Sequence, residues 1–561
     1  MVSKVLKLLN REVGAVNQAA LLLGMFTLLS QVLGLVRDRM FTSSIGAGKE
    51  LDIYYAAFQV PDLLFNSVAT LVSVTVLLPF LLSIIKEKGN KESLAFFSQV
   101  FTVFFAFVTV SALVLFFLLP KITSIIAPGF DISQQLELVR ISRVILLSPI
   151  LLGISNLFGS VTQMAKRFVL FAVSPVLYNL GIVVGIALLY PMFGLMGLAY
   201  GVVLGAVLHA AIQIPALIKD TMLPKFTRKI DWQRIKKLGV VSLPRTLGLT
   251  LHSLTLLVLV AFATTIKDGA VSIFRLSMNL QNVPLALVGA SFSVAAFPTL
   301  AQDFTNGRTK EFLQNISNAT RQIIFWSLPI TALFIVLRAQ IVRVILGSQT
   351  FTWSDTRLAA ATLAMFVVSV TAQSLILLFT RAFYATGDTK RPVLINLISS
   401  AVIVILAFLF FSYSQNLISF EGWLRPFLRL EDVAGVQVVA LALAYSVGSL
   451  LNAIVLIGVF KKRHKTKNQL QIGLTLWQTI AVSFVMGASA YGVLNILDTV
   501  FNLNTFGGIF SQGLIAGFVA ILVGVGMFYL VGNKEFQSVK KALSRKFKGV
   551  ETISVSQEDI G

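Results

Sequence analysis

The chain has 561 residues, of which 56% are hydrophobic and only 12% are charged. A soluble domain carries about 25% charged residues, so this composition excludes a set of soluble domains and indicates an all-α polytopic membrane protein. The formal net charge of +22 would suggest nucleic-acid binding in a soluble chain, whereas in a membrane protein it is typical of basic cytoplasmic loops. The lack of cysteine excludes disulfides and thiolate metal sites.

Fourteen apolar segments are long enough to cross the hydrocarbon core of a bilayer, which takes about 20 helical residues. The basic N-terminus lacks a signal-peptide cleavage site, and we expect it to flank a first retained helix. The fifth and sixth segments nearly touch at YPMFG (190–194). The predicted spans are 17–37, 52–84, 94–120, 138–163, 169–191, 193–218, 239–266, 270–300, 319–346, 357–384, 392–414, 433–460, 474–498 and 506–532.

Lys and Arg concentrate in every second loop of this arrangement. Examples are KEKGNK (86–91), the basic segment 219–237, KKRHKTK (461–467) and the tail 534–548. Because basic loops remain on the cytoplasmic side, the pattern predicts that both termini are cytoplasmic. The segment between spans 6 and 7 is also a candidate for an amphipathic helix on anionic headgroups.

The chain repeats two short markers at nearly the same spacing. KRFVL (166–170) recurs as KRPVL (390–394), and Val60-Pro61 recurs as Val283-Pro284. Six spans lie in each repeat, so both halves enter the membrane in the same orientation as a parallel duplication. The predicted organisation is an N-lobe (1–218), a basic cytoplasmic linker (219–238), a C-lobe (239–460), two C-terminal helices (461–532) and a cytoplasmic tail (533–561).

Such a duplication favours an alternating-access transporter with its site between two six-helix lobes, around a central cavity. The three histidines are scattered, and the sequence contains no Walker loop. We therefore expect no catalytic residues, no metal site and no cofactor, and an ion or the membrane potential is a possible energy source. Pro61 and Pro284, at equivalent points of spans 2 and 8, are predicted gate or hinge positions because proline frees a backbone carbonyl and permits a bend.

Ionisable residues near the end of the first span have two readings. Taken alone, Arg37, Asp38 and Arg39 are typical of an interfacial anchor; the alternative is a site for a charged ligand. Asp52 either begins the second span as a helix cap or faces such a site. If a proton drives transport through a carboxylate, the candidates are Asp38, Asp52 and Asp62.

Arg275 lies within the eighth span, and Asn279 and Asn282 follow at i+4 and i+7. These three residues share one helix face, which lipid would not tolerate. The face either packs against another helix or lines a cavity, and we expect the cavity.

The stretch SQVLGLVRDRMFTSSIGAGKELDIYYAAFQVPDLL (30–64) resembles the opening of the MurJ (MviN) family of lipid II flippases, within the multidrug/oligosaccharidyl-lipid/polysaccharide exporter superfamily. RAFYATGDTKRP (381–392) is similar to the turn after span 10 in that family. The matching elements of the first stretch are Ser30, Val32-Leu33-Gly34, Arg37-Asp38, Gly46-Ala47-Gly48, Asp52, Ala57-Phe58 and Pro61.

The resemblance implies a V-shaped pair of lobes in the bacterial cytoplasmic (inner) membrane. A central cavity would bind the headgroup of an undecaprenyl-diphosphate-linked precursor, and a groove at 461–532 would hold its lipid tail. The implied partners are this lipid-linked glycan and membrane lipids, with no nucleic acid, and the implied state is a monomer.

Three positions depart from the family pattern, because Gln31, Phe65 and Asn279 stand where arginine is expected. Arginine suits phosphate because its planar fork binds two oxygens at once, so their loss predicts weaker diphosphate binding that Arg275 partly offsets. The alternatives are a flippase for another polyprenyl-linked oligosaccharide, a small-molecule exporter of the same superfamily, and a non-transporting scaffold. The predicted substrate-binding residues are Ser30, Gln31, Arg37, Asp38, Asp52, Arg275 and Asn279.

Overall fold

The computed structural model describes residues 16–68, 74–416, 425–426, 428, 430–464, 472–503 and 505–547, and all its regular elements in these ranges are helices. The first half contains α2 (Val16–Ser44), α3 (Lys49–Ala57), α4 (Gln59–Ser67), α5 (Val74–Ile126), α6 (Ile132–Ile145), α7 (Leu147–Met164), α8 (Phe168–Val184), the π-helix η2 (Gly185–Leu189), α9 (Tyr190–Phe193), α10 (Leu195–Ala211), α11 (Ile214–Lys219) and α12 (Trp232–Thr264). The second half contains α13 (Ala270–Pro284), the π-helix η3 (Leu285–Ala290), α14 (Ser291–Thr305), α15 (Thr309–Val336), α16 (Arg338–Leu346), α17 (Trp353–Val367), α18 (Val370–Ala385), α19 (Lys390–Asn416), α21 (Gln437–Arg463), α22 (Ile472–Leu497), α23 (Phe506–Leu530) and α24 (Lys534–Phe547).

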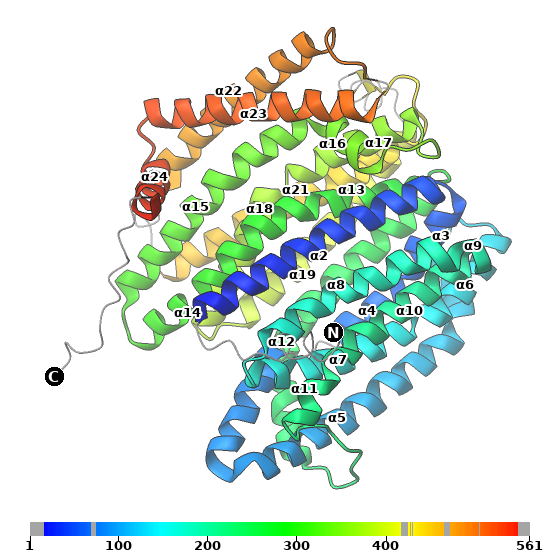
Figure 1. Ribbon diagram of the computed structural model, residues 1–561, viewed down its shortest axis with the longest axis vertical. Helices are drawn as coiled ribbons and strands as arrows, with labels where there is room; N and C mark the ends of the chain where they lie inside the picture. Colours follow the sequence, from blue (N-terminus) through cyan, green and yellow to red (C-terminus); the bar gives the residue numbers. More distant parts are fainter. Residues whose placement is uncertain are drawn as a thin grey trace. The chain divides into compact units, whose positions relative to one another are not determined.

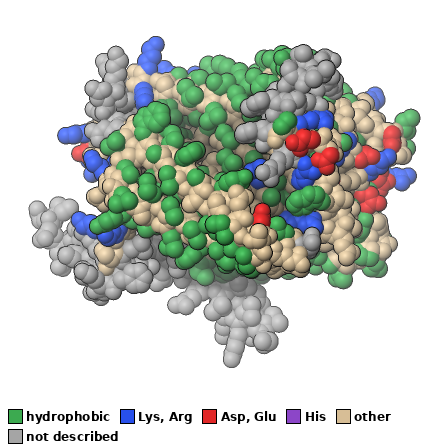
Figure 2. All heavy atoms as spheres, turned by 90° about the horizontal axis from the view of Figure 1, so that it is seen from above, with side chains coloured by type: hydrophobic (Ala, Val, Ile, Leu, Met, Phe, Trp, Pro, Cys, Tyr) green, Lys and Arg blue, Asp and Glu red, His purple; other side chains and the backbone are tan. Residues whose placement is uncertain are grey.

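Twelve helices among the described residues are long and apolar enough to cross a membrane. One of them, within α5, is interrupted at Gly89 (φ 81°, ψ 178°), so the expected spans 2 and 3 meet there in a sharp turn. Figure 2 shows one face of the molecule, on which hydrophobic side chains take up much of the surface. The polytopic all-α class is confirmed, whereas the number of fourteen spans remains a prediction.

The chain packs as two compact units. Unit 1 contains Met1–Val283, Val342–Phe366 and Asp388–Asn452, and unit 2 contains Pro284–Ile341, Val367–Gly387 and Ala453–Gly561. The predicted division into an N-lobe, a C-lobe and a C-terminal helix pair remains a prediction.

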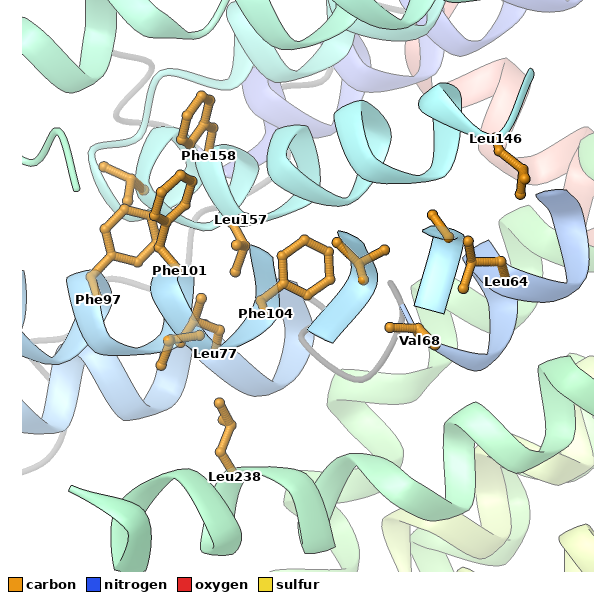
Figure 3. Close-up of a cluster of buried hydrophobic side chains, with 14 of the residues drawn as sticks. Leu64, Val68, Leu77, Phe97, Phe101, Phe104, Leu146, Leu157, Phe158 and Leu238 are labelled. Atoms are coloured by element: carbon orange, nitrogen blue, oxygen red, sulfur yellow. The ribbon is translucent and has the colours of Figure 1, made fainter. Parts of the chain in front are cut away.

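Aromatic and aliphatic side chains from six helices, α4, α5, α6, α7, α11 and α12, form a core cluster in unit 1 (Figure 3). Leu64 of α4, Phe101 of α5, Phe158 of α7 and Leu238 of α12 belong to this buried cluster. The Phe101 and Phe158 rings stack with centroids 6.4 Å apart. Burying one such aromatic side chain stabilises a fold by about 2 kcal/mol in water, and in lipid the close packing itself holds the helices together.

Helix α8, continued by η2, lies beside α10 in unit 1 and approaches it through glycines (Figure 1). A Cβ built on Gly181 would lie 2.3 Å from the Cα of Gly205, and one on Gly201 would lie 2.5 Å from the Cα of Gly185. Gly181 and Gly185 are four residues apart, as are Gly201 and Gly205, so each of these two pairs lies on one helix face. Small residues at this spacing let membrane helices approach closely. The short connection of η2 and α9 ends at Gly194, as the near contact of spans 5 and 6 predicted.

The basic segment 219–237 does not form one amphipathic helix, because only its ends are helical, Lys219 in α11 and 232–237 in α12. Residues 223–231 are not helical, and α12 begins only at Trp232, whose preceding Asp231 accepts a hydrogen bond from the amide of Arg234. Side chains of α5 satisfy the extended backbone instead: the amides of Lys225 and Thr227 donate to the hydroxyls of Ser98 and Thr102. A backbone whose amides are paired in this way has no need of helical hydrogen bonds.

In unit 2, α15, α22 and α23 pack together, and α24 closes their end (Figure 1). Phe325, Val482, Met486 and Phe528 form a small buried cluster among them. The buried carboxylate of Glu535 in α24 accepts hydrogen bonds from Arg321 at 2.7 Å and Thr475 at 3.2 Å. This polar contact fixes the start of α24 against two membrane helices.

Candidate functional site

A charged pair near the end of α2 is the centre of a polar network in unit 1. The Arg37 guanidinium donates through Nε and NH2 to Oδ1 of Asp38, at 3.0 and 2.7 Å. Asp38 is only 1% exposed, whereas the Arg37 side chain is 21% exposed. A buried carboxylate at membrane depth needs such a partner, because an unpaired charge there is costly.

Asn179 of α8 extends this network, and sequence reasoning missed it. Its side-chain oxygen accepts from Arg37 NH1 at 3.1 Å, and its amide donates to the hydroxyl of Ser30 at 3.1 Å. The structure thus connects Ser30 and Arg37, two turns apart on α2, through one amide of a neighbouring helix. The only signal in the sequence was a polar residue inside an otherwise apolar span.

Asn279 of α13 completes the network from the other side. Its amide donates to Oδ2 of Asp38 at 3.1 Å, so Asp38 accepts from α2 on one oxygen and from α13 on the other. Of the predicted site residues, the structure brings together Ser30, Arg37, Asp38 and Asn279. Their assignment to substrate binding remains a prediction.

Arg275 lies one turn before Asn279 and forms a separate ion pair. Its NH2 group lies 3.5 Å from Oδ2 of Asp62 in α4, with the arginine 15% and the aspartate 49% exposed. Arg275 and Asn279 are partly accessible and Asn282 is exposed, whereas most neighbouring residues of α13 are buried. The predicted polar face of this helix therefore lies where the unit is open, and the central cavity itself remains a prediction.

Asp52 holds the start of α13, although it lies in the first turn of α3. Its carboxylate accepts from the amides of Gly269 and Ser272, both at 2.7 Å, and from the Ser272 hydroxyl at 2.5 Å. The cap residue of α3 is Gly48, so Asp52 does not cap its own helix. A carboxylate at a helix N-terminus pairs unsatisfied amides and interacts favourably with the helix dipole.

Three other residues from the sequence interpretation lie outside the network. The Gln31 side chain is half-buried and makes no hydrogen bond within the described part of the chain. Arg39 donates to the carbonyl of Val344 at 2.7 Å, near the C-terminus of α16, where a cation is favourable. Phe65 packs against the apolar core cluster.

The turn between α2 and α3 requires glycine at one position. Gly46 has φ 79°, and a Cβ there would lie 2.6 Å from the carbonyl oxygen of Thr350. The Thr350 hydroxyl in turn donates to the carbonyl of Thr42 at 2.5 Å. This turn determines where α3, and with it Asp52, begins.

Both predicted hinge prolines lie close to a helix irregularity: Pro61 follows the break at Phe58 by three residues, and Pro284 is the last residue of α13. Pro61 has no amide hydrogen for the carbonyl of Ala57, where α3 ends, and the Ser142 hydroxyl donates to that carbonyl instead, at 3.3 Å. Pro284 ends α13, and the π-helix η3 follows it. Such irregular turns are frequent at functional sites, and the hinge role itself remains a prediction.

The described residues contain no group of three or more His, Asp or Glu side chains arranged to hold a metal ion. The chemistry of the network is that of binding: guanidinium, carboxylate and amide groups that pair with charged or polar ligand groups.

Residues 41–420 match the family described as lipid II flippase MurJ. Over 490 residues, 86% of this chain and 91% of the relative, the sequence is 24% identical to the probable lipid II flippase MurJ of Buchnera aphidicola subsp. Acyrthosiphon pisum. It is also 24% identical over 555 residues to that of Bdellovibrio bacteriovorus, covering 94% of this chain and 97% of the relative.

Two solved structures are similar in fold. A lipid II flippase MurJ in an inward closed conformation superposes with a TM-score of 0.70 at 18% identity, covering 93% of this chain and 100% of that chain. An inward-facing multidrug resistance transporter of the MATE family superposes with a TM-score of 0.61 at 15% identity, covering 78% of this chain and 96% of that chain.

Proposed function

Because the chain belongs to the MurJ family of lipid II flippases, we propose that it moves lipid II, an undecaprenyl-diphosphate-linked cell-wall precursor, from the cytoplasmic to the outer leaflet. The observation that carries the proposal is the family match over residues 41–420, which contain Asn179, Asn279 and Arg275 and begin just after Arg37 and Asp38. The mechanism is alternating access, and the protein acts as a transporter and not as an enzyme.

Each polar residue has a role in this proposal. Arg275 and Arg37 contact the diphosphate, because a guanidinium fork binds phosphate oxygens in pairs. Asn279, Ser30 and Gln31 contact polar groups of the headgroup. Asp38 and Asp52 position these contacts, Asp38 through Arg37 and Asn279 and Asp52 through the start of α13.

The setting follows from the same family. The protein lies in the bacterial inner membrane with both termini in the cytoplasm, and membrane lipids surround it. Pro61 and Pro284 permit the rearrangement between inward and outward states, and residues 461–532 hold the lipid tail. An ion or the membrane potential supplies the energy.

A second candidate is a flippase for another polyprenyl-linked oligosaccharide. The observation that favours it is the replacement of three expected arginines by Gln31, Phe65 and Asn279. Phe65 packs in the apolar core, so it supplies no cation at the position where arginine is expected. A less anionic headgroup would need fewer cationic contacts.

Complementation separates these candidates. We expect expression of the chain to restore growth of a bacterial strain depleted of its own lipid II flippase, and an Arg275→Ala variant to fail at equal membrane abundance. Failure of the wild-type chain, although correctly inserted, would contradict lipid II as the cargo. Restored growth with both proteins would remove Arg275 from the site.

A further inference from the structure

The two arginines of the site differ in how fully the protein occupies them. Arg37 donates through Nε, NH1 and NH2 to Asp38 and Asn179, with distances of 2.7 to 3.1 Å. Arg275 makes a single contact within the described residues, at 3.5 Å to Asp62. A guanidinium has five N–H donors, so Arg275 retains most of its capacity for a ligand.

The partner of Arg275 is held weakly. Asp62 is 49% exposed and reaches one nitrogen of Arg275 at the long end of hydrogen-bond range. A partly exposed ion pair of this kind contributes little to stability, and a bidentate anion makes a stronger contact with the same guanidinium. Asp38, in contrast, is 1% exposed and bound on both oxygens.

A second polar group in this part of unit 1 makes no hydrogen bond to any described residue. Tyr55 of α3 is 7% exposed, and its buried hydroxyl makes no hydrogen bond within the described part of the chain. The same hydroxyl lies within electrostatic range of Asp38, Arg37 and Arg275. A buried hydroxyl usually has a partner, which a ligand oxygen would supply here.

We propose that Asp62 occupies Arg275 in the empty transporter and is exchanged for the diphosphate of the lipid substrate. The inference rests on the proposed function and assigns Arg275 as the contact that forms only when substrate binds. Asp62 has two effects. It neutralises Arg275 while the site is empty, and it competes with the anion and so promotes release.

The direction in which substrate affinity changes when the Asp62 carboxylate is removed distinguishes this exchange from a direct contact between Asp62 and the substrate. Removal of a carboxylate that binds substrate would weaken binding. Removal of a carboxylate that competes with substrate strengthens it. A competing ion pair of this exposure changes the affinity by about three- to fivefold. Slower release accompanies the tighter binding, so transport falls although affinity rises.

The experiment measures the affinity of the purified full-length protein for undecaprenyl diphosphate, with undecaprenol as the uncharged probe. We expect Asp62→Asn to lower the Kd for the diphosphate about three- to fivefold and to leave undecaprenol binding unchanged. In an Arg275→Ala background the same substitution should have no effect on the Kd. Glu137→Gln removes a carboxylate from another ion pair of unit 1, with Arg140, and serves as the matched control.

An unchanged or raised Kd for Asp62→Asn, with wild-type binding intact, overturns the exchange and leaves the proposed function standing. An equal gain in the Arg275→Ala background also overturns it, because the effect would then not pass through Arg275. If the wild-type protein binds neither undecaprenyl diphosphate nor lipid II, the proposed function fails and the exchange fails with it.

Discussion

Two buried carboxylates near the start of the chain, Asp38 and Asp52, stabilise different parts of unit 1. Asp38 pairs with a cation and an amide, and both of these partners are candidates for ligand contact. Asp52 pairs with two backbone amides and a hydroxyl at the start of α13. Asp38 therefore determines the charge of the site, and Asp52 determines the position of the helix that carries Arg275 and Asn279.

We predict that Asp52→Ala lowers the free energy of unfolding by about 2 kcal/mol, because it leaves buried amides at the start of α13 without an acceptor. Thermal unfolding in detergent measures this. Asp268→Ala is the control, since the Asp268 side chain is 56% exposed and the substitution removes only an ion pair with Lys49, whose atoms are 3.9 Å apart. Equal unfolding temperatures for the two variants would show that the Asp52 contacts contribute nothing.

The sequence predicted Ser30, Arg37, Asp38 and Asn279 as site residues through their motif and their spacing, and the structure connects these four. It did not predict Asn179, because one amide in an apolar span has no periodicity to reveal its direction. It also left the role of Asp52 open, because the partner amides of this carboxylate lie more than two hundred residues away in the chain. Contacts of that range depend on tertiary packing, which local patterns do not contain.

Among the secondary-structure elements, turns and helix breaks determine where the candidate site residues lie. The turn at Gly46 orients α3, Phe58 separates α3 from α4 three residues before Pro61, and Pro284 ends α13. The length of the apolar segments located most of the membrane helices, because each needs about 20 apolar residues to cross the bilayer. It gave one continuous second span where the structure has α3, α4 and the start of α5, since hydropathy does not detect a helix break near a proline. The turn at Gly89 lies in the predicted loop between spans 2 and 3.

Gly46→Ala should destabilise the protein by about 1–2 kcal/mol, because a side chain there adopts a left-handed conformation and meets the Thr350 carbonyl. Gly48→Ala is the matched control two residues later. Gly48 has an extended backbone (φ −151°), and a Cβ there meets no atom within 4 Å. We expect a lower unfolding temperature only for Gly46→Ala; a similar loss in both variants would contradict the role of the Thr350 contact.

Pro61→Ala tests the predicted hinge. The new amide hydrogen can donate to the Ala57 carbonyl, which now accepts from Ser142, and joins α3 to α4 as one helix. We expect unchanged or slightly raised thermal stability together with slower transport in reconstituted vesicles. Transport at the wild-type rate in a well-folded variant would exclude a hinge at this position.

The whole molecule is an apolar helical protein of two compact units, in which a small set of charges is retained at membrane depth. These charges are costly in lipid, and unit 1 holds them in pairs with specific partners. The number of apolar segments, the internal duplication and the motif at 30–64 together indicated the family. Membrane helices are readily predicted because they need apolar segments of a certain length and basic residues in the cytoplasmic loops. The cargo depends on a few side chains, three of which depart from the family pattern.

Translocation of fluorescent lipid II by the purified full-length chain in sealed proteoliposomes tests the proposed function most directly. A membrane-impermeant quencher reports how much of the labelled lipid reaches the outer leaflet. We predict that the wild-type chain rapidly exposes the labelled lipid to the quencher and that Arg275→Ala does so slowly at equal reconstitution. Protection equal to that of protein-free vesicles, from a folded and correctly inserted wild-type chain, would contradict a lipid II flippase.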